Sequence, residues 1–286
     1  VVGAGGGKVL DAARAAAAAP RLPVVTCPTV ASSDAPCSAL SVIYTDEGVV
    51  EGSRFYRKNP DLVLVDTQVI ALSPPRLLVA GMGDALATWF EARTCVEGHV
   101  KNLRGGLSTQ AALALAKLCY RTLLSDGADA LRAVQAQVVT PALERIVEAN
   151  TLLSGLGFES SGLAAAHAIH NGLTTAPATH AYLHGEKVAF GLLAQLVLEG
   201  QPRSVLRRVL GFATEVGLPI TLAGIGLTAL PGEQLHWIAV RAPGEGDTMQ
   251  NEPFGVRPDM VADAILAADA IGRAWKKDAD PRQGAS

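Results

Sequence analysis

The chain has 286 residues, of which 49% are hydrophobic and 18% are charged, and its formal net charge at pH 7 is −3. This length allows an extensive hydrophobic core in one large or two ordinary domains. The charge balance gives no electrostatic reason to expect nucleic acid or an anionic membrane as a partner, and no apolar run reaches the roughly 20 residues that cross a bilayer.

Short β-branched segments and turns dominate the first quarter of the chain. The predicted elements are a strand ending at Val1–Val2, a helix at Val9–Ala19, a strand at Leu22–Cys27, a hairpin of Leu40–Tyr44 and Gly48–Tyr56 that turns at Asp46–Gly48, and a strand at Leu62–Val65. Strand, glycine turn, helix and strand in succession indicate an α/β layer with parallel strands. Because the chain opens without Met on the end of a strand, we expect an N-terminally truncated sequence that lacks the neighbouring strands.

A glycine-rich turn, Gly3–Lys8 (GAGGGK), lies between the first strand and the first helix. Backbone N–H groups at a helix N-terminus bind phosphate, and glycines let the backbone approach it closely. The turn is not a Walker A loop, because Val9 stands where that loop has Ser or Thr, and Lys8 replaces the third glycine of GxGxxG. We expect it to bind the pyrophosphate of a dinucleotide, and a tight turn without ligand is the alternative.

A polar loop, Pro28–Leu40 (PTVASSDAPCSAL), follows the second strand. Open α/β sheets bind ligands outside the carboxyl ends of their strands, which is where this loop is expected to lie. Asp34 is its only charged residue and is therefore a candidate ligand contact. An Asx turn stabilised by Asp34 and Ser38 is the alternative.

Helical patterns with glycine- and proline-containing breaks dominate from Pro75 onward. The predicted helices are Pro75–Val96, Thr109–Leu124, Ala128–Val138, Pro141–Leu153, Glu159–Asn171, Glu186–Leu198, Arg203–Val216, Glu233–Val240 and Pro258–Trp275. The sequence therefore predicts an α/β domain at residues 1–74 and an all-helical domain at residues 75–286.

The four cysteines form neither a CxxC pair nor a zinc-finger spacing. Four cysteines in a chain of this size do not make a disulfide scaffold, so we expect reduced thiols and a cytoplasmic protein. Cys95 and Cys119 fall in helical patterns and are predicted to be small buried residues of the core.

The segment Gly157–Gly191 holds four of the six histidines. His167 and His170 are three residues apart, hence on one face of an alanine-rich helix. A buried imidazole needs partners for both ring nitrogens, and neutral imidazole is a good metal ligand. His184 follows glycine and proline breakers, so a second element must fold back to present it. His99, His180 and His236 are predicted to be surface or partly satisfied histidines, and a place in the pocket is the alternative for His180, whose loop delivers His184.

Asp84 lies in the apolar helical segment Gly81–Ala92 (GMGDALATWFEA). Taken alone, it is explained by a carboxylate near a helix N-terminus. Together with His167 and His184, however, it completes two histidines and one carboxylate, a set that is typical of catalytic zinc sites with one open position. The same set suits non-haem iron. His170 is predicted to lie behind the ligands, where it holds one of them or passes protons.

Five segments resemble the glycerol dehydrogenase family of the iron-containing alcohol dehydrogenase superfamily: GGGK, PTVASSDAPCSALSVIYTDEG, GMGDALATWFEA, TPALERIVEANTLLSGLGFESSGLAAAHAIHNGL and HGEKVAFG. They occur in the right order over almost the entire chain. The resemblance implies the remainder of a Rossmann-like NAD-binding α/β domain at residues 1–74 and a helical metal- and substrate-binding domain at residues 75–286. This is the architecture of dehydroquinate synthase and the iron alcohol dehydrogenases, with the active site between the domains. The resemblance also suggests a homo-oligomer, with an octamer as the expected state.

The resemblance further implies zinc-dependent oxidation of glycerol and related vicinal diols, with NAD as acceptor and dihydroxyacetone as product. Asp84, His167 and His184 match the family's zinc ligands and border the substrate, Asp34 matches a substrate-contacting aspartate, and the candidate catalytic residues are Asp34 and His170. The residues that match NAD contacts are Gly5, Gly6, Gly7, Lys8, Asp11, Thr29, Ser32, Ser38, Leu40 and Tyr44. Iron-dependent relatives have a further metal-binding histidine where this chain has Thr88, which favours zinc.

Two other functions remain open at this point. An enzyme with the same fold and a phosphorylated substrate, such as a glycerol-1-phosphate dehydrogenase or a dehydroquinate-synthase-like enzyme, would need a basic cluster near the metal. The metal-binding segments offer mainly Lys187. A non-catalytic metal-binding module is the other alternative. The expected truncation supports it, because part of the cofactor-binding domain would be missing.

Overall fold

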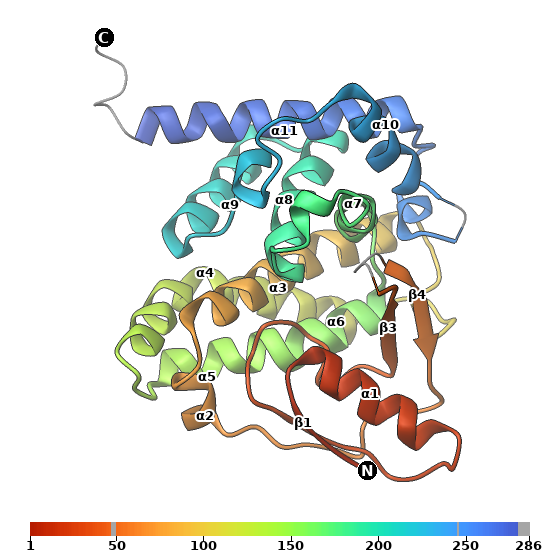
Figure 1. Ribbon diagram of the computed structural model, residues 1–286, viewed down its shortest axis with the longest axis vertical. Helices are drawn as coiled ribbons and strands as arrows, with labels where there is room; N and C mark the ends of the chain where they lie inside the picture. The colour runs from red at the N-terminus through yellow and green to blue at the C-terminus, as the bar shows by residue number, and fades with distance from the viewer. Residues whose placement is uncertain (47–49, 245, 280–286) are drawn as a thin grey trace.

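The computed structural model describes residues 1–46, 50–244 and 246–279. The strands and α1 (Gly7–Ala18) gather at one end of the molecule, near the N-terminus, and the long helices fill the rest, with α11 (Pro258–Ala279) at the opposite end (Figure 1). The strands are β1 (Val2–Gly5), β2 (Val25–Pro28), β3 (Leu40–Tyr44), β4 (Val50–Phe55) and β5 (Leu62–Val63). The predicted combination of an α/β layer with a helical region is confirmed.

Three parallel strands in the order β1–β2–β5 form the main sheet, with Val2 opposite Val25 and Val25 opposite Leu62. Helix α1 connects β1 to β2 and buries Leu10 and Ala17. The succession of strand, glycine turn, helix and strand thus gives the predicted β–α–β unit.

The predicted hairpin forms as two antiparallel strands, β3 and β4, with Leu40 opposite Phe55 and Tyr44 opposite Val50. Its turn, which the sequence predicted at Asp46–Gly48, lies largely outside the described residues, because the description stops at residue 46 and resumes at residue 50.

Helices of very different length make up the remainder of the described chain. They are α2 (Thr67–Ala71), α3 (Pro75–Glu97), α4 (Gln110–Gln135), α5 (Pro141–Glu148), the π-helical turn η1 (Ala149–Leu153), α6 (Ser154–Ser161), α7 (Ala165–Leu173), η2 (Pro177–Thr179), α8 (His184–Leu198), α9 (Arg203–Val216), η3 (Leu222–Ile225), α10 (Gly232–Arg241), η4 (Thr248–Asn251) and α11. Helix α2 was not predicted from the sequence; its N-cap Asp66 accepts a hydrogen bond from the backbone of Gln68.

The predicted break between Leu153 and Glu159 is absent, because α5, η1 and α6 follow one another without a gap. Two further helix predictions are wrong, and glycine explains both. A break was predicted before Ala128, but α4 runs through Gly127, where a Cβ would lie 2.7 Å from Phe212 Cε2, so this glycine permits close packing on α9. One helix was predicted over Glu159–Asn171, but Gly162 has a φ of +121° and separates α6 from α7. A glycine's role thus depends on what lies opposite it.

Helix α3 lies at the centre of the helical region and packs against α4, α6 and α8. Gly81 lets the polar loop approach, because a Cβ there would overlap the carbonyl oxygen of Ala31. Asn150 fixes this contact by donating hydrogen bonds to the carbonyl oxygens of Ala31 at 3.0 Å and Leu78 at 3.2 Å. The loop after β2 is thereby held beside the middle of α3, where Asp84 lies.

All described strands precede α3, but the domain boundary between residues 74 and 75 remains a prediction. Cys95 and Cys119 are buried free thiols, as expected for core residues. Among the described residues, none of the helices combines the length and the apolar character that crossing a bilayer requires.

Candidate metal centre

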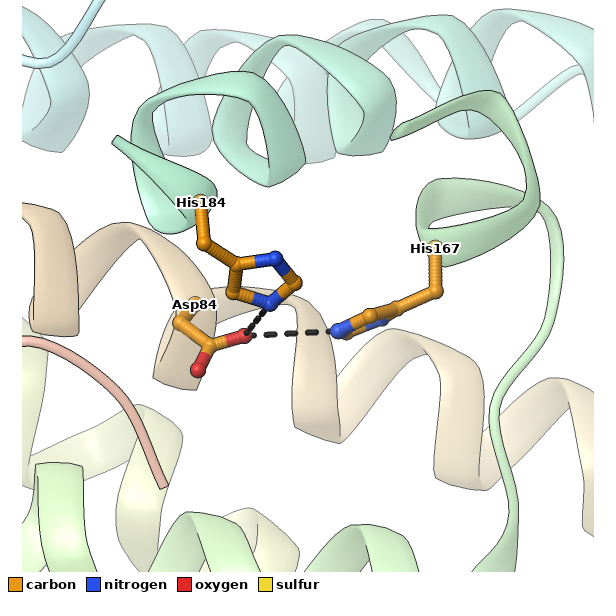
Figure 2. Close-up of side chains that lie close together, drawn as sticks. All are labelled: Asp84, His167 and His184. Carbon is orange, nitrogen blue, oxygen red and sulfur yellow. Dashed lines mark ion pairs between the residues drawn. The ribbon is translucent and has the colours of Figure 1, made fainter. Parts of the chain in front are cut away.

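Asp84, His167 and His184 come from three different helices and point toward one another (Figure 2). Asp84 Oδ1 lies 3.3 Å from His167 Nε2 and 3.2 Å from His184 Nε2. One ligand atom from each residue falls within 4.8 Å of the other two. The exposed fractions of the side chains are 1% for Asp84, 13% for His167 and 29% for His184, so the site is closed on the Asp84 side and accessible beside His184.

His184 is the first residue of α8, and that end of the helix is tied to the start of α3. Arg76 of α3 donates two hydrogen bonds to Glu186, from Nε to Oε1 at 2.6 Å and from Nη2 to Oε2 at 2.7 Å. Glu186 Oε2 also accepts from the backbone N–H of Leu183 at 2.8 Å. This bidentate pair fixes the place at which His184 enters the site.

His167 lies in the first turn of α7, a helix that has no side-chain N-cap of its own. Its free N–H groups are instead bound by side chains of other elements. Glu91 Oε1 accepts from Ala164 and His167, Glu252 Oε1 from Ala165, and Gln195 Oε1 from Ala166, at 2.8–3.1 Å. The backbone of His167 is therefore positioned by tertiary contacts.

The second nitrogen of each imidazole also has a partner. His167 Nδ1 lies 2.6 Å from Glu91 Oε2 and donates to it, since a carboxylate only accepts. His184 Nδ1 lies 3.0 Å from His170 Nε2, and His170 Nδ1 lies 3.2 Å from Asn171 Oδ1. These contacts orient both rings with Nε2 toward Asp84, an arrangement typical of metal-binding histidines.

The electrostatics of the site favour a bound cation. Burial acts to raise the pKa of Asp84, but the two imidazoles, His184 first, hold it well below its ordinary value. Burial acts to lower the pKa of His167, but Glu91 and Asp84 raise it well above the ordinary value. Burial, with His184 and Lys187, lowers the pKa of His170. Positive charge is thus stabilised between Asp84 and the two Nε2 atoms.

This donor set fits a divalent metal ion. Asp84 Oδ1 is buried and accepts no well-aligned hydrogen bond from the part of the chain that the structure describes. Two imidazole nitrogens and one carboxylate oxygen, with solvent access on one side, match catalytic zinc and also non-haem iron. That these three residues bind metal remains a prediction.

Asp34 lies next to these residues, at the edge of the polar loop. Its backbone N–H donates to Asp84 Oδ2 at 3.2 Å, and its Oδ2 accepts from Ser154 Oγ at 2.8 Å. The Ser154 hydroxyl in turn lies 2.8 Å from Thr88 Oγ1. Burial and the charge of Asp84 raise the pKa of Asp34 well above its ordinary value. Thr88 thus supports Asp34 through Ser154.

The glycine turn and the polar loop lie side by side, as expected for a dinucleotide site. Helix α1 begins at Gly7 without a side-chain cap, which leaves its N-terminal amides to an anion. A Cβ on Gly6 would meet nothing closer than Val30 at 3.6 Å, and one on Gly7 nothing closer than Ala35 at 3.7 Å. The backbone of Thr29 donates to the carbonyl oxygen of Gly5 at 3.1 Å.

The other predicted NAD contacts differ in exposure. Lys8 and Thr29 are exposed and Ser32 is half-buried, whereas Ser38 and Leu40 are buried. The carboxylate of Asp11 is paired with Arg14, whose Nη1 donates to the carbonyl oxygen of Ala35, so this pair supports the polar loop from below. The side chain of Tyr44 lies outside the described residues. Contact of these residues with NAD remains a prediction.

Sequence reasoning missed Glu91, although the sequence contains a signal for it. Glu91 follows Asp84 by seven residues, hence two helical turns, and is an isolated acidic residue in an apolar helix. Such a residue on the same face as Asp84 indicates a partner within the site. The predicted surface positions of His99, His180 and His236 are confirmed, since all three are exposed.

Glu252, which binds the amide of Ala165, should make folding less stable as the pH rises. Burial and the facing carboxylates, Glu199 first and also Glu91 and Glu97, raise its pKa from 4.5 to about 8. Because the pKa of this carboxyl group is higher in the folded than in the unfolded protein, the free energy of unfolding is highest below pH 4.5 and falls as the pH rises to 8. Glu252→Gln keeps an acceptor for Ala165 and should raise the free energy of unfolding at pH 8 by about 4 kcal/mol.

Urea unfolding of the wild type and Glu252→Gln between pH 5 and pH 8 measures this effect. The difference between the two proteins should grow with pH. A constant difference over this range would show that Glu252 has an ordinary pKa in the folded protein.

Comparison with known proteins places this site in context. A model of the family described as iron-containing alcohol dehydrogenase matches residues 1–67. The glycerol dehydrogenase of Citrobacter freundii is 57% identical over 275 residues, which are 96% of this chain and 75% of that protein. The glycerol dehydrogenase of Thermotoga maritima is 57% identical over 276 residues, 96% of this chain and 76% of that protein.

A similar solved structure is that of a probable glycerol dehydrogenase from Sinorhizobium meliloti 1021. It superposes with a TM-score of 0.93 at 45% sequence identity and covers 96% of this chain and 77% of its own. Similarity in sequence and in fold thus extends over both the strand-containing and the helical parts of the molecule.

Proposed function

Since this chain belongs to the glycerol dehydrogenases of the iron-containing alcohol dehydrogenase family, we propose that it oxidises glycerol to dihydroxyacetone with NAD as hydride acceptor. The fold implied by the resemblance is confirmed by the same relatives. The observation that carries the proposal is the convergence of Asp84, His167 and His184 in a chain 57% identical to a curated glycerol dehydrogenase.

We propose zinc as the resident metal, held by Asp84, His167 and His184. The additional histidine of iron-dependent relatives is replaced by Thr88, whose hydroxyl is engaged with Ser154. A bound divalent cation would act as a Lewis acid that lowers the pKa of the substrate hydroxyl. His170 is proposed to assist by holding His184 through the Nδ1–Nε2 hydrogen bond.

Asp34 is proposed to select substrates that carry a second hydroxyl. Its Oδ2 is held by Ser154, and its backbone N–H is bound to Asp84, so the carboxylate is fixed beside the metal centre. A neighbouring hydroxyl of glycerol would bind this carboxyl group, which orients the carbon that loses hydride. A simple alcohol has no group for this contact.

Residues 1–74 are proposed to bind NAD, with the pyrophosphate at Gly5–Lys8, and residues 75–286 to bind metal and substrate. The glycine turn is joined to the polar loop by the hydrogen bond from the backbone of Thr29 to the carbonyl oxygen of Gly5 at 3.1 Å, and the same loop carries Asp34. When bound, NAD would accept the hydride of the alcohol carbon. We also propose a cytoplasmic homo-oligomer.

The two rival functions are not favoured. A phosphorylated substrate would need a basic cluster, but Lys187 is buried and its pKa is lowered by that burial. A module without catalytic function would not need Asp34 beside the proposed metal ligands. This aspartate is held in place by the hydroxyl groups of Ser154 and Thr88.

NAD reduction with four substrates tests the proposal. Glycerol and propane-1,2-diol should be turned over efficiently, while ethanol and glycerol phosphate should be poor substrates. Asp34→Asn should raise the KM for glycerol about tenfold, because an NH₂ group replaces one oxygen of the carboxyl group and a hydrogen bond to the second hydroxyl is lost, and leave the KM for ethanol nearly unchanged.

Two results would contradict this assignment. Faster turnover of glycerol phosphate than of glycerol would favour the phosphorylated substrate. An equal rise of both KM values in Asp34→Asn would remove the proposed role of Asp34 in diol selection.

A further inference from the structure

Glu91 is a fully buried carboxylate to which the proposed reaction assigns no role. It lies on α3, two turns after Asp84, and all of its described hydrogen bonds go to the start of α7. Oε1 accepts from the backbone N–H of Ala164 at 2.8 Å and of His167 at 3.1 Å, and Oε2 lies 2.6 Å from His167 Nδ1. One carboxylate thus binds both the backbone and the ring of the same histidine.

We propose that Glu91 is a positioning residue that fixes the tautomer and the ring orientation of His167 and thereby sets the metal affinity of the site. This inference rests on the proposed metal site. A carboxylate accepts hydrogen bonds, so Nδ1 must carry the hydrogen and the lone pair of Nε2 is left for a cation. The ring cannot turn without losing this buried, charge-assisted bond.

The geometry explains why both oxygens of Glu91 are needed. Binding through Oε1 fixes the first turn of α7, and binding through Oε2 fixes the imidazole relative to that turn. Because Asp84 and Glu91 project from one face of the same helix, α3 determines the distance between the Asp84 carboxylate and His167 Nε2. The spacing of the two proposed ligands Asp84 and His167 therefore depends on α3 and on its contact with α7.

Two neighbouring side chains provide the comparison that isolates this role. Gln195 and Glu252 also bind first-turn amides of α7, those of Ala166 and Ala165, at 2.8 Å and 3.1 Å. Within the described chain, neither of them contacts an imidazole. They contribute to the placement of α7, whereas Glu91 in addition acts on the ring of His167.

Glu91→Gln separates these two contributions. The amide oxygen can still accept from the backbone of α7, but the amide NH₂ group cannot accept from Nδ1–H of His167. The affinity for Zn²⁺, measured by competition with a chromophoric chelator at pH 7, should fall about tenfold to a hundredfold. The matched control Glu252→Gln, which also keeps its backbone acceptor, should bind Zn²⁺ within about twofold of the wild type.

Nitrogen-15 NMR of the Zn²⁺-loaded wild type tests the proposal independently of any variant. The signals of His167 should show a hydrogen on Nδ1, with the shift of a strong hydrogen bond, and metal coordination at Nε2. In Glu91→Gln the Nδ1–H signal should lose this shift, which a change confined to helix packing would not cause.

The outcomes distinguish a failure of the proposed role of Glu91 from a failure of the proposed metal site. A Glu91→Gln protein that binds Zn²⁺ as tightly as the wild type, or a His167 that carries its hydrogen on Nε2, would overturn the role of Glu91. A wild type that binds no Zn²⁺ would overturn the metal site itself, and the inference with it.

Discussion

Replacing His184 with alanine should abolish Zn²⁺ binding and glycerol oxidation and leave the fold intact. His184 offers one of the three proposed ligand atoms, and Asp84 with His167 alone would be a weak site. Stabilisation of the reacting oxygen by a metal is worth several kcal/mol, so kcat/KM should fall by at least about a thousandfold. The fold should persist, because the His184 side chain lies at the end of α8 and is 29% exposed.

His180→Ala is the matched control for this variant. His180 lies four residues earlier in the same connecting segment, is exposed, and contacts the carbonyl oxygen of Thr174 at 2.8 Å. Metal content and NAD reduction of both variants should be measured on the same preparations. Full turnover of glycerol by metal-free wild type, or wild-type zinc content in His184→Ala, would refute the metal-dependent scheme.

Two residues of the candidate metal centre, Asp84 and His167, could be predicted because each of them conflicts with its local sequence. His167 and Asp84 are polar residues in helices that are otherwise alanine- and leucine-rich, and a buried charge or imidazole requires a partner. The hairpin of β3 and β4 and the β–α–β unit could be predicted from local periodicity alone. In these cases the information lies within each element and its immediate neighbours along the sequence.

Other features could not be predicted because they depend on what lies opposite in the folded chain. The first turn of α7 is bound by Glu91, Gln195 and Glu252, which are 29 to 87 residues distant along the sequence. Gly127 was predicted to break a helix, but it lies inside α4 because Phe212 packs against it. A glycine inside a helix and a glycine between two helices look the same in the sequence, and only the packing of the folded chain distinguishes them.

The crossing of α3 and α8 sets the distance between Asp84 and His184. Gly83 and Gly185 face each other there, and a Cβ added at either would overlap backbone of the other helix: the carbonyl oxygen of Gly185 in one case and that of Ala80 in the other. A Cβ at Gly185 would also lie 2.9 Å from the backbone nitrogen of Asp84. Only glycine allows the backbones that carry Asp84 and His184 to approach this closely.

Gly185→Ala should therefore reduce both stability and metal affinity. The new methyl group meets backbone atoms that cannot rotate away, so the helices must separate, and the free energy of unfolding of the metal-free protein should fall by about 3 kcal/mol. Zn²⁺ affinity should fall at least about tenfold, because Asp84 and His184 move apart. Gly211→Ala is the control: Gly211 lies in α9, a Cβ there meets nothing within 4 Å, and this variant should gain about 0.5–1 kcal/mol. Wild-type stability and Zn²⁺ affinity in Gly185→Ala would show that α3 and α8 can form the site without their close contact.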